Sequence, residues 1–299
     1  MSEPAIVLGA NQYGKAEVRV VKVTRDRARH EIDDLDVTSQ LRGDFTAAHV
    51  EGDNAHIVPT DTQKNTIYAF AQDGVGSPEA FLLRLADHFT SSFEWVTGGR
   101  WAADRYAWQR MHVAGAEHDH AFVRSGQEVR TAVVVADGDE RHVLAGLTGL
   151  TVLRTTGSGF EAYPRDRYTT LAETRDRILA TDVTTRWRYG RADVDYDATW
   201  TSVRSLLLDA FAEPYSPGLQ ATLYGMGRRV LEAHGEIAEI RFSMPNKHHF
   251  AVDLSPFGLD NPNEVFHAAD RPYGLIEAAV VREGAVSPAV AWDGIAGFC

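Results

Sequence analysis

The chain has 299 residues, of which 44% are hydrophobic and 24% charged, as in an ordinary globular protein with a sizeable core. Its 30 basic and 42 acidic residues give a formal net charge of −12, which argues against nucleic acid as the main partner, because phosphate binding requires a basic face. The sequence has no apolar run of the roughly 18 residues that a membrane span needs, no signal-peptide pattern and no peroxisomal S-K-L ending. The single cysteine, Cys299, excludes a disulfide framework and a multi-cysteine metal site. We therefore expect a cytoplasmic protein.

Two helices are predicted in the first half of the chain, among several strands. Thr60, with Gln63 three residues later, forms a capping-box pattern that begins a helix over 60–71. Ser77-Pro78 begins a second helix, because proline is favoured at the first helical position. Valine-rich or alternating patterns predict strands over 16–24, 30–41, 102–113, 128–136 and 142–153.

The second half repeats this order loosely. A short helical piece is expected at 177–179, and longer helices are expected over 199–212 and from Ser216-Pro217 onward. Strands are predicted over 236–243, 249–254 and 275–282. Each half thus contains a strand pair, two helices and another strand pair, without a residue-level repeat. These patterns favour an α+β protein of two similar packed halves, 1–150 and 151–299.

Lysine is rare in this chain, which has four lysines against 26 arginines. Lys15 follows Tyr13-Gly14, directly before the first predicted strand. An ammonium group can lose its proton in a protein, whereas a guanidinium cannot. Lys15 is therefore a candidate catalytic amine, and the alternative interpretation is a surface lysine in a turn.

Thr60 and Asp61 stand at the predicted start of a helix. The free N–H groups at a helix N-terminus favour a bound anion. The alternative is a plain helix cap, and one threonine hydroxyl cannot serve a cap and a ligand equally well.

Two histidine pairs suggest a metal at first sight. His118 and His120 share a strand face and could form an H-x-H site, but no cysteine and no Glu-x-x-His element completes a ligand set. His248 and His249 are adjacent on a predicted strand and therefore point to opposite faces. We predict no metal site.

Several short segments occur together in a fixed order. They are YGK at 13–15, VPTDTQKNTIYAFA at 58–71, AGLTGLTVLRTT at 145–156, RDRYTTL at 165–171, DRILATD at 176–182, DYDATW at 195–200, QATLYGM at 220–226 and MPNKHHF at 244–250. Through these segments the chain resembles the urate oxidase (uricase) family along nearly its whole length. The resemblance implies the tunnelling fold (T-fold), an α+β fold of two tandem halves of antiparallel sheet with helices on one face.

The resemblance also implies an assembly and a reaction. Four chains would form a homotetramer whose sheets close into barrels, with active sites at the subunit interfaces. Urate would be oxidised by O2 and water to 5-hydroxyisourate and hydrogen peroxide, without a metal or organic cofactor. No nucleic acid or membrane takes part.

Site residues are implied by the same resemblance. Lys15, Thr60 and His248 would form the catalytic proton relay. The residues that contact the substrate would be Thr60, Asp61, Phe160, Arg177, Leu219, Gln220 and Asn246. Since the carboxylate of Asp61 would repel a urate anion, we expect its backbone N–H to make the contact.

The implied contacts fit the chemistry of urate, a flat anion with donors and acceptors at its rim. Phe160 would stack on the purine, and Arg177 and Gln220 would bind its edge through a planar fork and an amide. Leu219, at a position where relatives often have valine, would offer its backbone. Asn246 would hold O2 or the attacking water.

Two other classes remain as alternatives. Another tunnelling-fold enzyme would act on a pterin or guanine nucleotide and use zinc or a purine-anchoring glutamate, but Cys299 is badly placed as a ligand. A non-catalytic assembly protein would keep the barrel and lose the chemistry, but every matched site residue is present.

Overall fold

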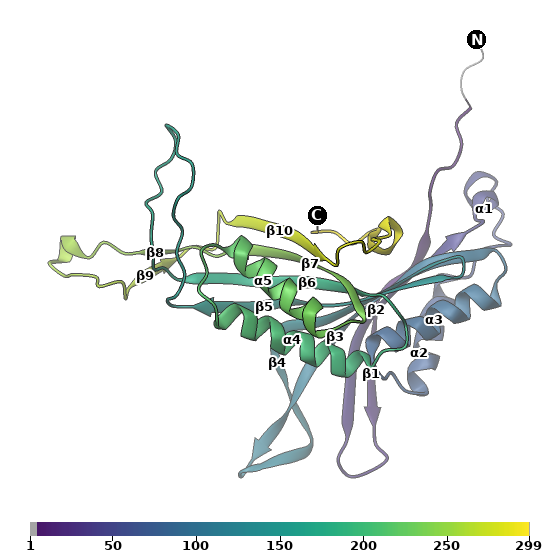
Figure 1. Ribbon diagram of the computed structural model, residues 1–299. Helices are drawn as coiled ribbons and strands as arrows, with labels where there is room; N and C mark the ends of the chain where they lie inside the picture. Colours follow the sequence, from purple (N-terminus) through teal and green to yellow (C-terminus); the bar gives the residue numbers. More distant parts are fainter. Residues whose placement is uncertain (1–4, 299) are drawn as a thin grey trace. The chain divides into compact units, whose positions relative to one another are not determined.

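The computed structural model describes residues 5–298, which form two compact units (Figure 1). The first unit extends to Ala145 and includes Arg191–Tyr196 and Ser287–Asp293. The second comprises Gly146–Gly190, Asp197–Val286 and the residues from Gly294 onward. The expected boundary at 150 falls inside a strand, so the division into halves 1–150 and 151–299 stays a prediction.

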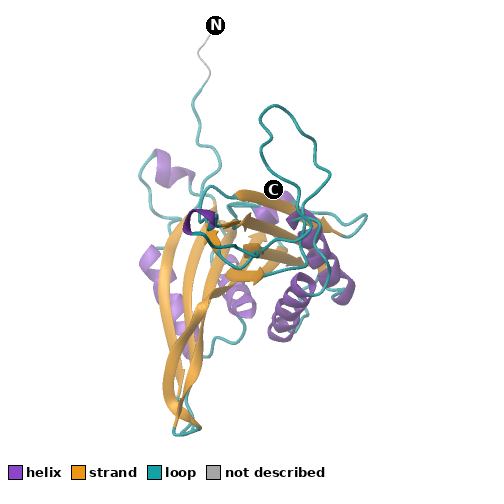
Figure 2. Ribbon diagram, turned by 90° about the vertical axis from the view of Figure 1, so that its left-hand side faces the viewer, coloured by secondary structure: helices purple, strands orange, loops and turns teal. Residues whose placement is uncertain are grey.

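The first unit is an antiparallel sheet with helices on one face (Figure 2). Its strand order is β1-β2-β3-β4-β5. The strands are β1 (Tyr13–Thr24), β2 (Glu31–Gly43), β3 (Val96–Val113), β4 (Ala116–Asp137) and the start of β5 (Glu140–Arg154). The helices are α1 (Thr46–Val50), α2 (Thr60–Gln72) and α3 (Pro78–Ser92). The β1–β2 and β3–β4 hairpins extend past the helices as long arms (Figure 1).

Burial in the first unit explains why α3 packs on the sheet. Phe81, Leu85 and Phe89 recur on one helical face and are fully buried. The Phe89 ring stacks 6.4 Å from that of Trp101 on β3. The helix begins at Pro78 as predicted, and Ser77 caps it by accepting a hydrogen bond from the Ala80 N–H at 3.3 Å.

The second unit has the same design. Its strand order is β5-β6-β7-β10, and β6 pairs with β7, and β7 with β10, in antiparallel register. The added strands are β6 (Leu179–Tyr189), β7 (Ile237–Asn246) and β10 (Gly274–Val281), and β8 (His249–Ala251) and β9 (Phe266–Ala268) form a separate small ladder. The longer helices are α4 (Tyr196–Ala212) and α5 (Leu219–Ala233). A short 3₁₀ turn, η1 (Ser255–Phe257), also belongs to this unit, whereas a second one, η2 (Ala289–Trp292), belongs to the first unit.

The predicted α+β class and the antiparallel sheet with helices on one face are confirmed, but several local predictions are wrong, among them the strand over 249–254, which ends at Ala251. The expected helical piece at 177–179 does not form, because Leu179 begins β6, in which buried Leu179 and Val183 face the core. The helix expected from Ser216-Pro217 begins later, at Leu219. No helix within residues 5–298 is long and apolar enough to cross a membrane.

Candidate active site

Lys15 owes its orientation to a β-bulge. It pairs with Ser39 of β2, but the next paired residue of β1 is Val18, opposite Val37, so two residues of β1 oppose one of β2. Since side chains alternate along a strand, Lys15 and Val18 would face opposite ways without the bulge. With it, Lys15 shares the face of Ser39 and of buried Val18, which is the face covered by α2.

Gly14 is required by a close approach of β2. A β-carbon at this position would lie 1.8 Å from the Ser39 carbonyl oxygen, a distance at which no side chain fits. The tight pairing of β1 with β2 beside Lys15 therefore depends on glycine.

Thr60 is the first residue of α2, and not its N-cap as the capping-box pattern predicted. The N-cap residue is Pro59, which has no side chain to cap with, and the carboxamide oxygen of Gln63 accepts a hydrogen bond from Ser39 Oγ at 2.9 Å instead. The first N–H groups of α2 have no intrahelical acceptor, and no side chain caps them. The Thr60 hydroxyl is thereby released from the capping role that would have competed with a ligand.

The Asp61 carboxylate is turned to its own helix. It pairs with Lys64 and accepts a hydrogen bond from Asn65 Nδ2 at 3.0 Å. Its pKa is lowered by Lys64 first and also by Lys15, which places the Lys15 ammonium in the neighbourhood of this helix start. Because the carboxylate is engaged in this way, the backbone N–H of Asp61 is the group left for a ligand, and its contact with the substrate stays a prediction.

Lys15 differs from the other lysines in its contacts. Lys22 Nζ donates to the Gln72 carbonyl at 2.9 Å, Lys64 pairs with Asp61, and Lys247 pairs with Asp182 at 2.5 Å. Within residues 5–298, Lys15 alone among the lysines has no hydrogen-bond or ion-pair partner. Its amine is therefore available for a ligand.

Phe160 lies in a short bridged loop of the second unit. Its backbone exchanges hydrogen bonds with Thr174, at 2.7 Å and 3.1 Å, and Gly159 N–H donates to the Ser216 carbonyl at 2.9 Å. A β-carbon on Gly159 would lie 2.9 Å from the Thr174 carbonyl oxygen and 2.2 Å from Tyr215 Oη, so this crossing also needs glycine. Tyr163, which sequence reasoning missed, stacks on the Phe160 ring with centroids 4.9 Å apart. A flat ligand would therefore use the other face of Phe160 or displace Tyr163.

Arg177 stands beside Phe160. Its N–H donates to the Ser158 carbonyl at 2.8 Å, and its guanidinium carbon lies 5.2 Å from the centre of the Phe160 ring. Its Nε is buried and has no hydrogen-bond partner among the described residues. A half-buried cation with an unused donor next to an aromatic face favours a flat anionic ligand.

Leu219 and Gln220 are the first two residues of α5. The N-cap residue is Gly218, so this helix start also lacks a side-chain cap. A β-carbon on Gly218 would lie 3.5 Å from Gln220 Oε1 and 3.7 Å from Phe160 Cδ2, so the Gln220 amide and the Phe160 ring flank the same glycine. Leu219 is buried, which leaves only its backbone for a ligand.

Asn246 and His248 lie at and just beyond the end of β7. Asn246 shares a strand face with buried Met244 by alternation, and Lys247 N–H ties the segment to the Ala180 carbonyl at 2.9 Å. Burial first, and then the positive charge of Arg177, lowers the pKa of His248 below its ordinary value. The neutral imidazole that can accept a proton is thus favoured in the second unit.

We predict that Arg177→Gln raises the pKa of His248, because it removes a nearby positive charge. Histidine titration by NMR measures this directly, and Arg175→Gln, at an exposed arginine two residues away, is the matched control that should leave the pKa unchanged. The His248 imidazole binds a proton less readily in the folded protein than in the unfolded chain. The free energy of unfolding therefore falls as the pH drops below about 6.5. The Arg177→Gln variant should lose less stability over that range. An unchanged His248 titration would contradict the electrostatic influence of Arg177 on His248.

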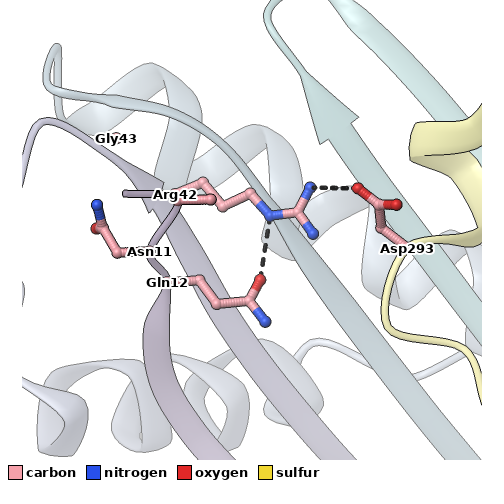
Figure 3. Close-up of a pocket in the computed structure, with 6 residues that line it drawn as sticks. Asn11, Gln12, Arg42, Gly43 and Asp293 are labelled. Carbon is pink, nitrogen blue, oxygen red and sulfur yellow. Dashed lines mark hydrogen bonds and ion pairs between the residues drawn. The ribbon is translucent and has the colours of Figure 1, made fainter. Parts of the chain in front are cut away.

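Neither the pair His118 and His120 nor the cavity of the first unit adds a residue to the candidate active site. The rings of His118 and His120 on β4 lie 4.5 Å apart at 88°, and no group of three or more metal-binding side chains occurs within residues 5–298. A cavity of about 540 Å³ in the first unit is bordered by Gln12, Arg42 and Asp293 (Figure 3). None of the predicted site residues lines it.

The structure therefore brings the predicted residues together in two groups. Lys15, Thr60 and Asp61 gather at the start of α2 in the first unit. The second unit holds the other group: Phe160, Arg177, Leu219, Gln220, Asn246 and His248. In each group a helix start without a side-chain cap carries two of the residues.

Two units of antiparallel sheet with helices on one face define the tunnelling-fold class of proteins. The uricase family model matches residues 11–135 and 143–277. A uricase from Arthrobacter globiformis is 65% identical over 294 residues, which cover 98% of this chain and 96% of its own. A uricase from Danio rerio is 38% identical over 278 residues, 91% of this chain and 93% of its own. The crystal structure of the Arthrobacter globiformis uricase superposes with a TM-score of 0.93 and covers 95% of this chain and 98% of that one. The chain belongs to the uricase family.

Proposed function

We propose that the chain oxidises urate with O2 and water to 5-hydroxyisourate and hydrogen peroxide. Urate gives up two electrons, O2 takes them to become peroxide, and water supplies the hydroxyl group of the product. The observation that carries the proposal is the unpartnered Lys15 amine on the strand face that the uncapped first turn of α2 covers. Membership of the uricase family supports it.

Substrate binding follows from the second group of residues. Urate is a flat anion, so Phe160 offers it a stacking face and Arg177 a planar pair of donors. The Gln220 amide, which like Phe160 lies close to Gly218, can accept and donate at the purine edge. The uncapped N–H groups of α2 and α5 favour the same negative charge.

Proton transfer is the task of the remaining residues. O2 reacts slowly with a closed-shell molecule, so urate must be deprotonated until it can give up an electron. Lys15 and the uncommitted Thr60 hydroxyl take part in moving this proton, and His248, held neutral by burial and Arg177, joins them. Asn246 holds the oxygen species and then the attacking water.

The proposed assembly is a homotetramer with active sites at the subunit interfaces. The two groups of residues lie in different units of the chain. We propose that the first group of one subunit meets the second group of another, so that a complete site needs two chains. A monomer would then be inactive.

The proposed reaction uses no metal and no organic cofactor. The test is the loss of urate absorbance together with O2 uptake, measured on protein that has been exhaustively chelated and analysed for metals. We expect one O2 consumed per urate and no change of rate on chelation. A metal present once per chain, with activity lost when it is removed, would overturn the cofactor-free reaction, and no urate loss at all would overturn the proposed function.

A further inference from the structure

Tyr13 is a residue that the proposed reaction does not use. Its hydroxyl donates a hydrogen bond to the Val58 carbonyl at 3.1 Å, which joins β1 to the segment that leads into α2. Tyr13 lies two residues before Lys15, and Val58 lies two residues before Thr60. The bond therefore links the two short segments that carry the amine and the hydroxyl.

The surroundings of Tyr13 make this bond a fixed one. The side chain is half-buried, and its ring meets that of buried Phe45 edge-on with centroids 4.8 Å apart. Burial raises the pKa of the Tyr13 phenol, so the hydroxyl keeps the proton that it donates. An aromatic ring packed in this way has few rotamers, which makes it a stiff link.

A second bond reinforces the link from β2. Ser39, the strand partner of Lys15, donates to Gln63 Oε1 at 2.9 Å, and both side chains are fully buried. Gln63 lies one turn after Thr60 in α2. Two hydrogen bonds thus join the neighbours of Lys15 to the Thr60 segment: one reaches Val58, before Thr60, and the other reaches Gln63, after it.

We propose that Tyr13 is a positioning residue that, together with the Ser39–Gln63 pair, holds Lys15 in register with Thr60. This role rests on the proposed function, in which Lys15 and Thr60 move a proton. Proton transfer requires the Lys15 amine and the Thr60 hydroxyl to lie within hydrogen-bond reach. A displacement of about 1 Å can lower the rate about 100-fold. Tyr13 touches no substrate and acts only through the placement of Lys15.

The decisive variant is Tyr13→Phe, which removes the hydroxyl and keeps the ring. We expect kcat to fall by about 10- to 100-fold with KM within about twofold of wild type, because positioning acts on the chemical step. Tyr196→Phe is the matched control, since the Tyr196 hydroxyl also donates to a backbone carbonyl, that of Ala192, at 2.8 Å. The control should lose comparable stability and keep kcat. Wild-type kcat in Tyr13→Phe, or an equal loss in Tyr196→Phe, would overturn the inference.

The Ser39–Gln63 hydrogen bond provides a second test of how Lys15 is positioned. Ser39→Ala should lower kcat in the same way, Ser39→Thr should retain activity because it keeps a hydroxyl, and the double variant with Tyr13→Phe should show non-additive loss. Additive effects, or Ser39→Ala with wild-type kcat, would contradict a shared role.

A spectroscopic measurement separates this inference from the proposed function. Carbon-13-labelled lysine gives NMR signals from only four residues, and Lys15→Arg identifies the one that belongs to Lys15. Tyr13→Phe should shift the Lys15 signal and leave those of Lys22, Lys64 and Lys247 in place, whether or not urate is oxidised. An unmoved Lys15 signal refutes the positioning role, whereas a wild-type protein that does not oxidise urate refutes the proposed function alone.

Discussion

Replacement of Lys15 by arginine should leave urate binding nearly unchanged and lower kcat by about 10²- to 10⁴-fold, the usual contribution of positioned acid–base catalysis. This corresponds to about 2.7–5.5 kcal/mol of activation free energy. Arginine keeps the positive charge and much of the length of the side chain, but a guanidinium cannot lose its proton in a protein. Steady-state kinetics with urate, together with the pH dependence of kcat/KM, measures the effect, and the acidic limb of that profile should shift or vanish.

The control for this variant is Lys22→Arg. Lys22 is on the same strand and only donates a hydrogen bond to the Gln72 carbonyl, which a guanidinium can also do. It should therefore retain wild-type kinetics. If a correctly assembled Lys15→Arg protein turned over urate at the wild-type rate, Lys15 would serve only to attract the anion, and Thr60 and His248 would have to move the proton alone.

Two inactive variants should restore activity when they are combined. A Lys15→Ala chain lacks a residue of the first group, and an Arg177→Ala chain lacks one of the second. If each site takes the first group from one subunit and the second from another, random mixing in equal amounts leaves about a quarter of the sites intact. Co-expression or refolding of the mixture, followed by the urate assay, should recover activity of that order.

The matched mixture combines Lys15→Ala with Thr60→Ala, whose changes fall in the same group. No site in that mixture can be complete, so it should stay inactive. Verified mixed assemblies of Lys15→Ala and Arg177→Ala without any activity would refute the shared site.

The sequence predicts the architecture well where the periodicity is strong. The helical spacing of Phe81, Leu85 and Phe89 and the Ser77-Pro78 start predict α3, and the helix begins at Pro78. The prediction of a helical piece at 177–179 is wrong because this short segment carries no periodicity of its own, and its end belongs to the strand that follows. Leu179 begins eleven residues of β6, whose threonines and arginines weaken the usual apolar alternation.

Local patterns alone could not predict the candidate site. The bulge after Lys15 leaves no clear signal in a valine-rich strand, although it decides which face the amine takes. The Thr60–Gln63 pattern predicted a cap, but burial of Gln63 against Ser39 overrode it. The stacking of Tyr163 on Phe160 depends on a loop conformation that no periodicity describes. The resemblance to uricases supplied the site residues that spacing could not.

The two helix starts without side-chain caps would couple ligand binding to the local stability of two helices. Pro59 and Gly218 leave the first turns of α2 and α5 short of hydrogen-bond acceptors, whereas Ser77 supplies one to α3. An anion that accepts from these N–H groups would satisfy them and so stabilise the first turns against local opening. In hydrogen exchange, the amides of the first turns of α2 and α5 should then slow together when a ligand binds, although they lie in separate units, while those of α3 keep their rate. The exchange rates of the first-turn amides of α2 and α5 would then report ligand binding in both helices, without any measurement of the reaction.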